Sequence, residues 1–150
     1  MTDRWGPPTW FFFHCFAEKI NDDFYEKEYK KCFNIIKSVC ASLPCPVCQR
    51  HAMTYLKRVN VHSLRKKDDF KRFLFNFHNY ANVNTKKKTE NINILQKYEK
   101  GIFINISKYF FQNFYSRQLL LRNFSMQMYE KKILKEIKDW LTKNIGHFSN

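Results

Sequence analysis

The sequence predicts an all-α fold, a helical bundle, and three observations support this prediction. Only three Gly and four Pro occur in 150 residues, and 18% of the residues are aromatic, which is typical of a tightly packed helical protein. Apolar residues recur at helical spacing over most of the chain. No segment alternates polar and apolar residues as a strand does, and the length allows one domain with a real core.

The first two predicted helices cover residues 7–20 and 24–43. Paired prolines suit a first helical turn, and the run PPTWFFFHCFAEKI contains no later breaker. In the second helix the apolar residues recur at helical spacing, the aspartates of the preceding NDD can cap it, and Pro44 ends it. One face of the first helix carries Trp10, His14 and Ala17.

The third predicted helix begins at Pro46 and continues through VCQRHAMTYLKR. Cys45 therefore lies at its mouth, while Cys48 and His51 lie one turn apart inside it. A cysteine at a helix N-terminus is close to the positive end of the helix dipole and to unpaired backbone N–H groups, both of which favour the thiolate. We therefore expect Cys45 to be open to attack and Cys48 to be shielded.

Three further helical segments are predicted in the second half of the chain. Residues 68–83 begin with capping aspartates and place apolar residues on one side. The polar run NTKKKTEN interrupts the pattern, and residues 92–115 resume it as one segment. Ser125 is a candidate cap for the last helix, residues 126–145, which ends at Gly146.

The charge of the chain is strongly positive. Lys and Arg number 27 against 13 Asp and Glu, which gives a formal net charge of +14. This excess favours an anionic partner such as nucleic acid, a phosphate-bearing cofactor, an acidic protein or a membrane surface, although a solvated lysine-rich face is the commoner reason for it. The N-terminal run MTDRWGPPTW lacks the apolar core of a secretory signal, and no window of 18 apolar residues predicts a membrane span.

The five cysteines do not match a secreted disulfide framework, because the count is odd and four of them lie within residues 32–48. A zinc site around Cys45 and Cys48 would need two more ligands, and the nearby His51 and His62 do not have the spacing of a common zinc finger. No metal site is therefore predicted.

Packing and redox chemistry are the other two interpretations of the cysteines. Free cysteine behaves as a small hydrophobe, which suits Cys15, Cys32 and Cys40 on the apolar stripes better than it suits Cys45. Two thiols as close as Cys45 and Cys48 can close into a disulfide and reopen by exchange. A thioredoxin-like module would need a βαβ context that this sequence lacks, so a helical dithiol protein needs another electron acceptor.

Three blocks of residues carry a resemblance to a known family. They are Trp5-Gly6-Pro7-x-x-Trp10-x-x-x-His14, Pro44-Cys45-x-x-Cys48-x-x-His51, and His78-Asn79-x-x-Asn82 followed by Lys87. In order and approximate spacing they resemble the Erv/ALR flavin-linked sulfhydryl oxidases. The resemblance implies an oxidase domain over residues 1–100, a four-helix bundle with a short fifth helix. Residues 101–150 lie outside the resemblance and are predicted to form a helical extension of unassigned role.

The resemblance also implies an enzyme, a thiol oxidase that binds FAD noncovalently and forms a homodimer. Cys45 would exchange with protein thiol substrates, Cys48 would face the flavin, and electrons would pass through both to O2, giving H2O2. The other residues implied around the cofactor are Trp5, Gly6, Trp10, His14, His51, His78, Asn79, Asn82, Tyr98 and, at a phosphate, Lys87.

Departures from the family pattern resemble the minimal forms found in large DNA viruses. Phe75 replaces a structural cysteine of cellular members, and Ala81 replaces a valine. The resemblance thus implies a cytoplasmic protein, in the host cytoplasm or virion rather than the mitochondrial intermembrane space. No cysteine lies in a terminal tail, so we expect the substrate, such as a thioredoxin-like protein, to meet Cys45 directly; a relay through Cys40 is the alternative.

Two other function classes are consistent with the composition. A basic helical module could bind nucleic acid, but no known DNA- or RNA-binding motif is visible, and no nucleic-acid partner is predicted. A zinc-stabilised interaction domain would unfold when its metal is chelated.

Overall fold

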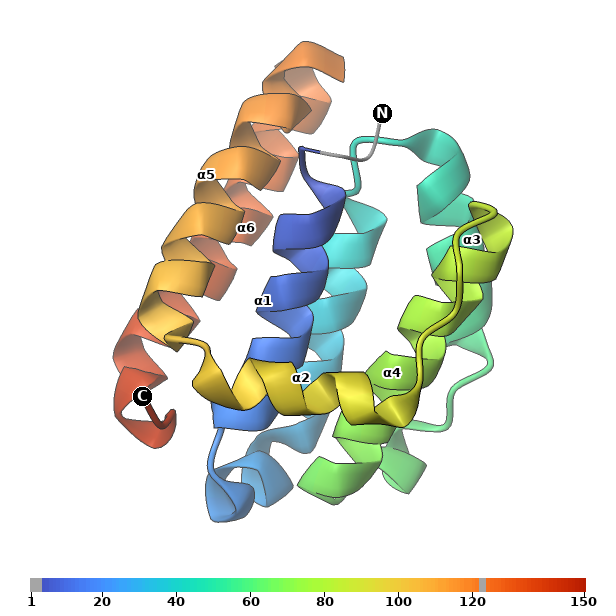
Figure 1. The fold of residues 1–150 in the computed structure, drawn as a ribbon. Helices are drawn as coiled ribbons and strands as arrows, with labels where there is room; N and C mark the ends of the chain where they lie inside the picture. The colour runs from blue at the N-terminus through green and yellow to red at the C-terminus, as the bar shows by residue number, and fades with distance from the viewer. Residues whose placement is uncertain (1–3, 122–123) are drawn as a thin grey trace.

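The computed structural model describes residues 4–121 and 124–150, and its elements are helical (Figure 1). The helices are α1 (Gly6–Lys19), α2 (Asp22–Ala41), α3 (Pro46–Lys57), α4 (Lys67–Asn84), α5 (Phe103–Leu121) and α6 (Phe124–Asn144), with the 3₁₀ segments η1 (Val61–Leu64), η2 (Ile92–Lys100) and η3 (Ile145–His147). Within the described residues the extended pairing is limited to one bridge, between Ile20 and Phe148. The predicted all-α fold is confirmed.

Helix α1 lies at the centre of the molecule, and α4, η2 and α5 pack against it (Figure 1). Most of its side chains are buried, because the run FFFHCFA is apolar apart from His14 and its apolar residues are not confined to one stripe. Helices α2, α3 and α4 complete the bundle, and η2, drawn in yellow, runs across the lower part of the bundle against α1 and α4. In the described part of the chain no helix is both long and apolar enough to cross a membrane.

Aromatic rings join α5 and α6 to α1. Phe12 stacks on Phe110 with ring centroids 4.4 Å apart, and the ring of Phe16 lies 6.3 Å from that of Trp140. Such offset or stacked pairs add to the free energy gained by burying their area. The segment predicted as an extension therefore shares the core of the bundle, and the domain boundary at residue 100 stays a prediction.

The single helical segment predicted over residues 92–115 is wrong, because η2 and α5 are separate elements. Gly101 lies between them with extended backbone, φ −70° and ψ 146°. A Cβ atom on Gly101 would come within 2.9 Å of the Cys15 sulfur and 2.8 Å of Ile106 Cδ1. The chain thus approaches α1 at a point where a side chain does not fit, which hydrophobic periodicity cannot reveal.

The caps predicted for three helices are also wrong. At α2 the cap is Asn21, whose Oδ1 accepts a hydrogen bond from the backbone N–H of Phe24 at 3.3 Å. The aspartates predicted to cap α2 and α4 lie within the first turns of those helices, where negative charge suits the helix dipole. Ser125 lies inside α6, which begins one residue earlier. The errors move helix ends by a residue or two and leave the elements unchanged.

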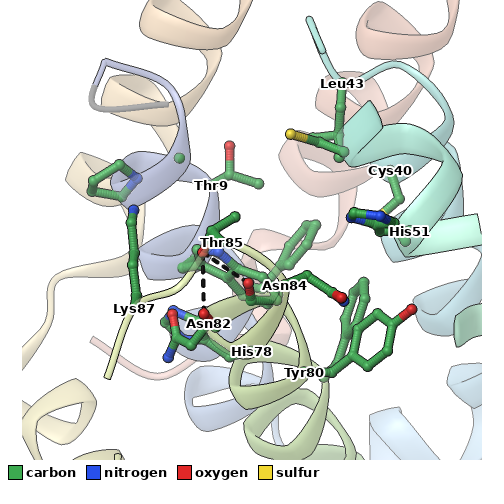
Figure 2. A pocket seen from close by; sticks show the side chains of 18 of the residues that line it. Thr9, Cys40, Leu43, His51, His78, Tyr80, Asn82, Asn84, Thr85 and Lys87 are labelled. Atoms are coloured by element: carbon green, nitrogen blue, oxygen red, sulfur yellow. Dashed lines mark hydrogen bonds between the residues drawn. The ribbon is translucent and has the colours of Figure 1, made fainter. Parts of the chain in front are cut away.

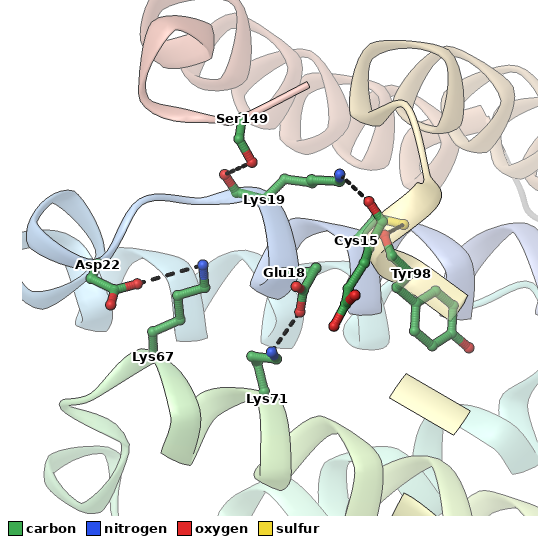
Figure 3. Close-up of polar contacts among 9 residues, drawn as sticks. Cys15, Glu18, Lys19, Asp22, Lys67, Lys71, Tyr98 and Ser149 are labelled. Atoms are coloured by element: carbon green, nitrogen blue, oxygen red, sulfur yellow. Dashed lines mark hydrogen bonds and ion pairs between the residues drawn. The ribbon is translucent and has the colours of Figure 1, made fainter. Parts of the chain in front are cut away.

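Polar contacts fix the C-terminal end of α1 (Figure 3). The buried Lys19 donates from Nζ to the main-chain oxygens of Glu99 at 2.6 Å and Asn150 at 3.0 Å. The carbonyl of Lys19 accepts from the backbone N–H of Ser149 at 2.7 Å. The neighbouring Glu18 forms an ion pair with a lysine of α4. These contacts join α1 to η2, to α4 and to the segment that follows α6.

Candidate active site

Cys45 and Cys48 form a disulfide at the start of α3, with their Cα atoms 5.2 Å apart, as disulfide geometry requires. Cys45 is the N-cap residue, and its sulfur accepts a hydrogen bond from the backbone N–H of Cys48 at 3.2 Å. Pro46 suits the first helical position because it has no N–H to satisfy there. The predicted place of Cys45 at the mouth of the helix is confirmed.

The two cysteines differ in their relation to a neighbouring pocket. Both cysteines are half-buried, and the expected contrast between an open Cys45 and a shielded Cys48 stays a prediction. Cys48 lines an internal pocket, and Cys45 is not among the described residues that line it. The disulfide therefore joins a sulfur on the pocket to one outside it.

The pocket next to Cys48 lies between α1, α3 and α4 and has a volume of about 280 Å³. Figure 2 shows Lys87 and His78 on one side of it and His51 and Cys40 on the other. Most of the cofactor residues predicted from the sequence line this pocket; they are Trp5, Gly6, Trp10, Cys48, His51, His78, Asn82, Lys87 and Tyr98.

The remaining two predicted residues, His14 and Asn79, line an adjoining recess of about 320 Å³. The recess shares His78, Asn82 and Tyr98 with the pocket. The three sequence blocks thus converge on two connected cavities, of the size that takes small-molecule ligands. The cofactor role of each residue stays a prediction.

Four rings form a stack along one wall of the cavities. The ring of Trp10 lies parallel to that of His78, with centroids 4.1 Å apart and planes inclined by 5°. His14 Nε2 lies 2.9 Å from His78 Nδ1, and the ring of His14 stacks on Tyr98 at 4.6 Å. A flat, apolar wall with a few ring nitrogens suits a planar aromatic ligand.

The two histidines of this stack are uncharged at neutral pH. Burial, then the neighbouring His78 and Lys97, lowers the pKa of His14 to about 3. Burial, then Lys97 and Lys87, lowers the pKa of His78 to about 4. Each neutral ring carries one N–H donor and one acceptor nitrogen, so one ring donates to the other. The pair can therefore form its hydrogen bond without a buried charge.

Lys87 reaches the pocket because of the way α4 ends. Lys86 has a left-handed backbone, with φ 59°. The N–H of Lys86 donates to the carbonyl of Val83 at 3.1 Å, and that of Lys87 donates to the carbonyl of Asn82 at 2.7 Å. These two bonds form a Schellman motif, which reverses the chain just after the helix. The turn brings Lys87 to the edge of the pocket.

Asn79 holds the loop that follows this turn. Its Nδ2 donates to the carbonyl of Glu90 at 3.0 Å, and its Oδ1 accepts from the N–H of Glu90 at 2.9 Å. Asn82 Nδ2 also contacts Asn79 Oδ1, at 3.4 Å. In this structure the amide of Asn79 thus binds backbone at the rim of the recess.

Sequence reasoning missed Lys97, which lines both cavities. Its Nζ lies 5.1 Å from the ring centroids of both Phe11 and Tyr98, within the range of cation–π contacts. Lys97 is one of many lysines in the chain. It belongs to a 3₁₀ segment, whereas the hydrophobic periodicity predicts an α-helix there, so the direction of the Lys97 side chain could not be predicted.

The other three cysteines, Cys15, Cys32 and Cys40, are buried and free. Burial raises the pKa of Cys15 to about 11 and raises the pKa values of Cys32 and Cys40 well above the usual range. A protonated thiol is a poor nucleophile, so these cysteines act as core residues, as the packing interpretation predicts. Cys40 also lines the pocket beside Cys48, and a relay through it stays a prediction.

The ligands considered for zinc do not come together. His62 Nδ1 forms a hydrogen bond with the hydroxyl of Tyr29, and the two atoms lie 3.1 Å apart. In the described part of the chain no group of three or more His, Cys, Asp or Glu could hold a metal ion.

The fold and the site define an all-α class of thiol–disulfide protein, in which a Cys-x-x-Cys disulfide at a helix mouth adjoins an aromatic, lysine-edged pocket. The Erv1 / Alr family model matches residues 7–102, and the chain belongs to this family. The family resemblance read from the sequence is confirmed.

Two curated relatives are FAD-linked sulfhydryl oxidases of African swine fever virus, from a Kenyan and a Malawian isolate. Each is 36% identical to this chain over 85 residues, which is 57% of this chain and 71% of the relative. These relatives agree with the viral type of oxidase that the departures Phe75 and Ala81 resemble. No solved structure gives a significant match.

Proposed function

We propose that this protein is an FAD-dependent thiol oxidase that forms disulfides in protein substrates and passes the electrons to O2, giving H2O2. The observation that carries the proposal is that Cys48, half of the disulfide of α3, lines the same pocket as the stacked rings of Trp10 and His78. The names of the viral relatives support the same activity and the same cofactor.

The residues of the two cavities fit FAD by their chemistry. Flat rings such as Trp10 and Tyr98 suit an isoalloxazine or an adenine, and Asn82 and the neutral histidines offer donors and acceptors for ring heteroatoms. Lys87 and Lys97 line both cavities, and their cations would suit the phosphate groups of FAD. When bound, FAD supplies two-electron redox chemistry, and the protein supplies position and electrostatics.

The chain's own chemistry is disulfide exchange at Cys45. A substrate thiolate attacks the Cys45 sulfur, the Cys45–Cys48 bond breaks, and Cys48 leaves as a thiolate. A second substrate thiolate then attacks the substrate sulfur of this mixed disulfide, and Cys45 leaves as a thiolate. The substrate has lost two electrons to the cysteine pair, and its thiol protons go to solvent. The backbone N–H of Cys48, which donates to the Cys45 sulfur at the start of α3, favours the thiolate of Cys45.

Reoxidation needs an electron acceptor on the side of the disulfide that Cys48 faces, which is the pocket. The proposed roles therefore place Cys45 toward substrate and Cys48 toward cofactor. The burial of Cys15, Cys32 and Cys40 supports direct contact between Cys45 and a substrate such as a thioredoxin-like protein. The homodimer and the host cytoplasm or virion location also stay predictions.

The visible absorption spectrum tests the proposal. We expect the purified protein to be yellow, to bleach when dithiothreitol is added without air, and to recover its colour in air. Cys48→Ser should keep the colour and lose dithiothreitol-driven oxygen uptake, whereas the matched control Cys32→Ser should keep both. Protein that stays colourless after it has been refolded or incubated with FAD would refute the proposal.

A further inference from the structure

Helices α5 and α6 lie on the side of α1 away from α3 (Figure 1), and a groove of about 1000 Å³ runs between them. None of the described residues that line this groove lines the pocket at Cys48. The groove is therefore a second surface feature, separate from the redox site.

The floor of the groove is apolar. Its lining residues on α5 and on α6 recur every three or four positions, so each helix contributes one continuous stripe. Two floor residues are well exposed, Ile104 by 43% and Met128 by 53%. The apolar lining residues are Ile104, Phe111, Met128, Leu134, Leu141 and Ile145. Two adjacent apolar stripes of this kind form a groove that can bind the apolar face of a third helix.

The rim of the groove is basic on both sides. The lysines are Lys108 on α5 and Lys131, Lys132, Lys135 and Lys138 on α6. No Asp or Glu is among the described lining residues. Lys135 pairs with Asp139 at 3.0 Å, but both side chains are largely exposed, and such a pair contributes little stability. The rim is therefore complementary to an occupant with negative charge.

We propose that this groove, defined by the floor and rim residues above, binds an amphipathic helix with acidic flanks that belongs to a partner protein. The stripe from Met128 to Ile145 would accommodate a helix of about 17 residues at a rise of about 1.5 Å per residue. Lysines on both edges would pair with acidic residues on both flanks of that helix.

Two other occupants fit the groove less well. A second copy of this chain carries 27 basic and 13 acidic residues, so its surface would meet the lysine rim with mostly like charge. A membrane would favour apolar side chains on a convex face, whereas these line a hollow between two helices. The proposal goes beyond the thiol oxidase, because a partner bound here would leave Cys45 and Cys48 uncovered.

The direct test uses two synthetic, fluorescein-labelled helical peptides of about 18 residues. Both carry leucines at positions i, i+3, i+4 and i+7; one carries glutamates on the flanks and the other carries lysines there. Fluorescence anisotropy with the full-length protein should give saturable binding of the glutamate peptide alone, weakened by about tenfold or more when salt rises from about 50 to about 300 mM. Absence of saturable binding, or equal binding of both peptides, would overturn the proposal.

Charge-matched variants separate this groove from the overall positive charge. The rim variant carries Lys108→Glu, Lys132→Glu and Lys138→Glu. The control variant carries Lys27→Glu, Lys31→Glu and Lys37→Glu, at exposed positions of α2. We expect the rim variant to weaken binding of the glutamate peptide by about tenfold or more, and the control to weaken it by about twofold or less. An equal loss in both would mean that bulk charge binds the peptide, and would overturn the proposal.

A floor variant tests the apolar part of the proposal. Ile104→Gln with Met128→Gln changes two exposed side chains and should weaken the glutamate peptide about fivefold, because the helix loses apolar contacts. If this variant instead abolishes a dimer in sedimentation, or binding to phosphatidylserine vesicles, the groove belongs to a second copy or a membrane and the proposal fails. Dithiothreitol-driven oxygen uptake should be unchanged in every variant, so a failure here is distinguishable from a failure of the oxidase proposal.

Discussion

His14 and His78 show how single side chains set the electrostatics of the cavities. Their rings are stacked and hydrogen-bonded at 2.9 Å, and both pKa values are lowered far below 6.5. Because the folded protein keeps both rings neutral, the cavities carry the charge of Lys87 and Lys97 without a further buried cation. Anionic groups of a ligand are thus attracted by the lysines, while the rings remain available for stacking.

These two histidines predict that stability falls in acid. The unfolded chain takes up protons at its histidines below pH 6.5, whereas folded His14 and His78 stay neutral down to about pH 3 and 4. The stability that they contribute is present above pH 6.5 and is lost as pH falls, down to about pH 4 for His78 and about pH 3 for His14. The free energy of unfolding should drop by up to about 1.4 kcal/mol per pH unit for each histidine.

Urea unfolding at a series of pH values between 7.5 and about 4.5 measures this dependence. His78→Gln should make the pH dependence shallower by about one proton, because one of the two rings is removed. An identical pH dependence in this variant would show that His78 is not one of the groups responsible.

The backbone conformation of Lys86 lowers the free energy of unfolding by a measurable amount. Its φ of 59° places a side-chain-bearing residue in the left-handed region, where glycine is preferred at the end of a helix. Lys86→Gly should therefore stabilise the protein by roughly 1 kcal/mol in urea unfolding. Lys88→Gly, in the same exposed loop, is the control and should not stabilise it. A loss of stability in Lys86→Gly would contradict the strain assigned to this position.

At the scale of elements, the junction between η2 and α5 depends on one glycine. Gly101→Ala would place a methyl group within 3 Å of the side chains of Cys15 and Ile106, so the chain must shift away from α1. We expect a loss of about 1–3 kcal/mol in the free energy of unfolding. Gly146→Ala is a matched control, because a Cβ there meets nothing within 4 Å. Equal stability of the two variants would contradict the close packing at Gly101.

The first four helices could be predicted because their apolar faces repeat at helical spacing and proline or polar runs separate them. The junction at Gly101 could not, since the reason for the break lies in Cys15, far away in sequence. Asn21 was overlooked as a cap because two aspartates follow it and all three residues can cap a helix. Local patterns therefore locate the elements, and long-range contacts decide where they end.

The candidate site was predictable to a similar extent. The cofactor residues predicted from the three sequence blocks all line one of the two cavities, because these blocks match the family pattern at those positions. The exact burial of Cys48 was not predictable, since it depends on how α3 lies against α1 and α4. Lys97 was not predictable either, because its direction is set by a 3₁₀ segment.

At the scale of the whole molecule, the bundle and the C-terminal helices depend on each other. Phe12 and Phe16 on α1 are fully buried, and α5 and α6 supply the rings that pack against them. A fragment of residues 1–102 should therefore expose these rings, lose stability and self-associate, as measured by thermal unfolding and light scattering. The full-length chain is the control. A fragment that is monomeric and unfolds at the same temperature would support residues 1–100 as an independent domain.

The contact between residues 19–21 and 147–149 concerns the order of events during synthesis. The carbonyl of Lys19 and the N–H of Asn21 find their partners in Ser149 and His147, and Ile20 bridges Phe148. The two groups of residues are more than a hundred positions apart in the chain. During translation, the backbone hydrogen bonds of the turn between α1 and α2 therefore lack their partners until residue 149 has been synthesised. These contacts of the folded bundle therefore cannot form before the C-terminal segment has been made.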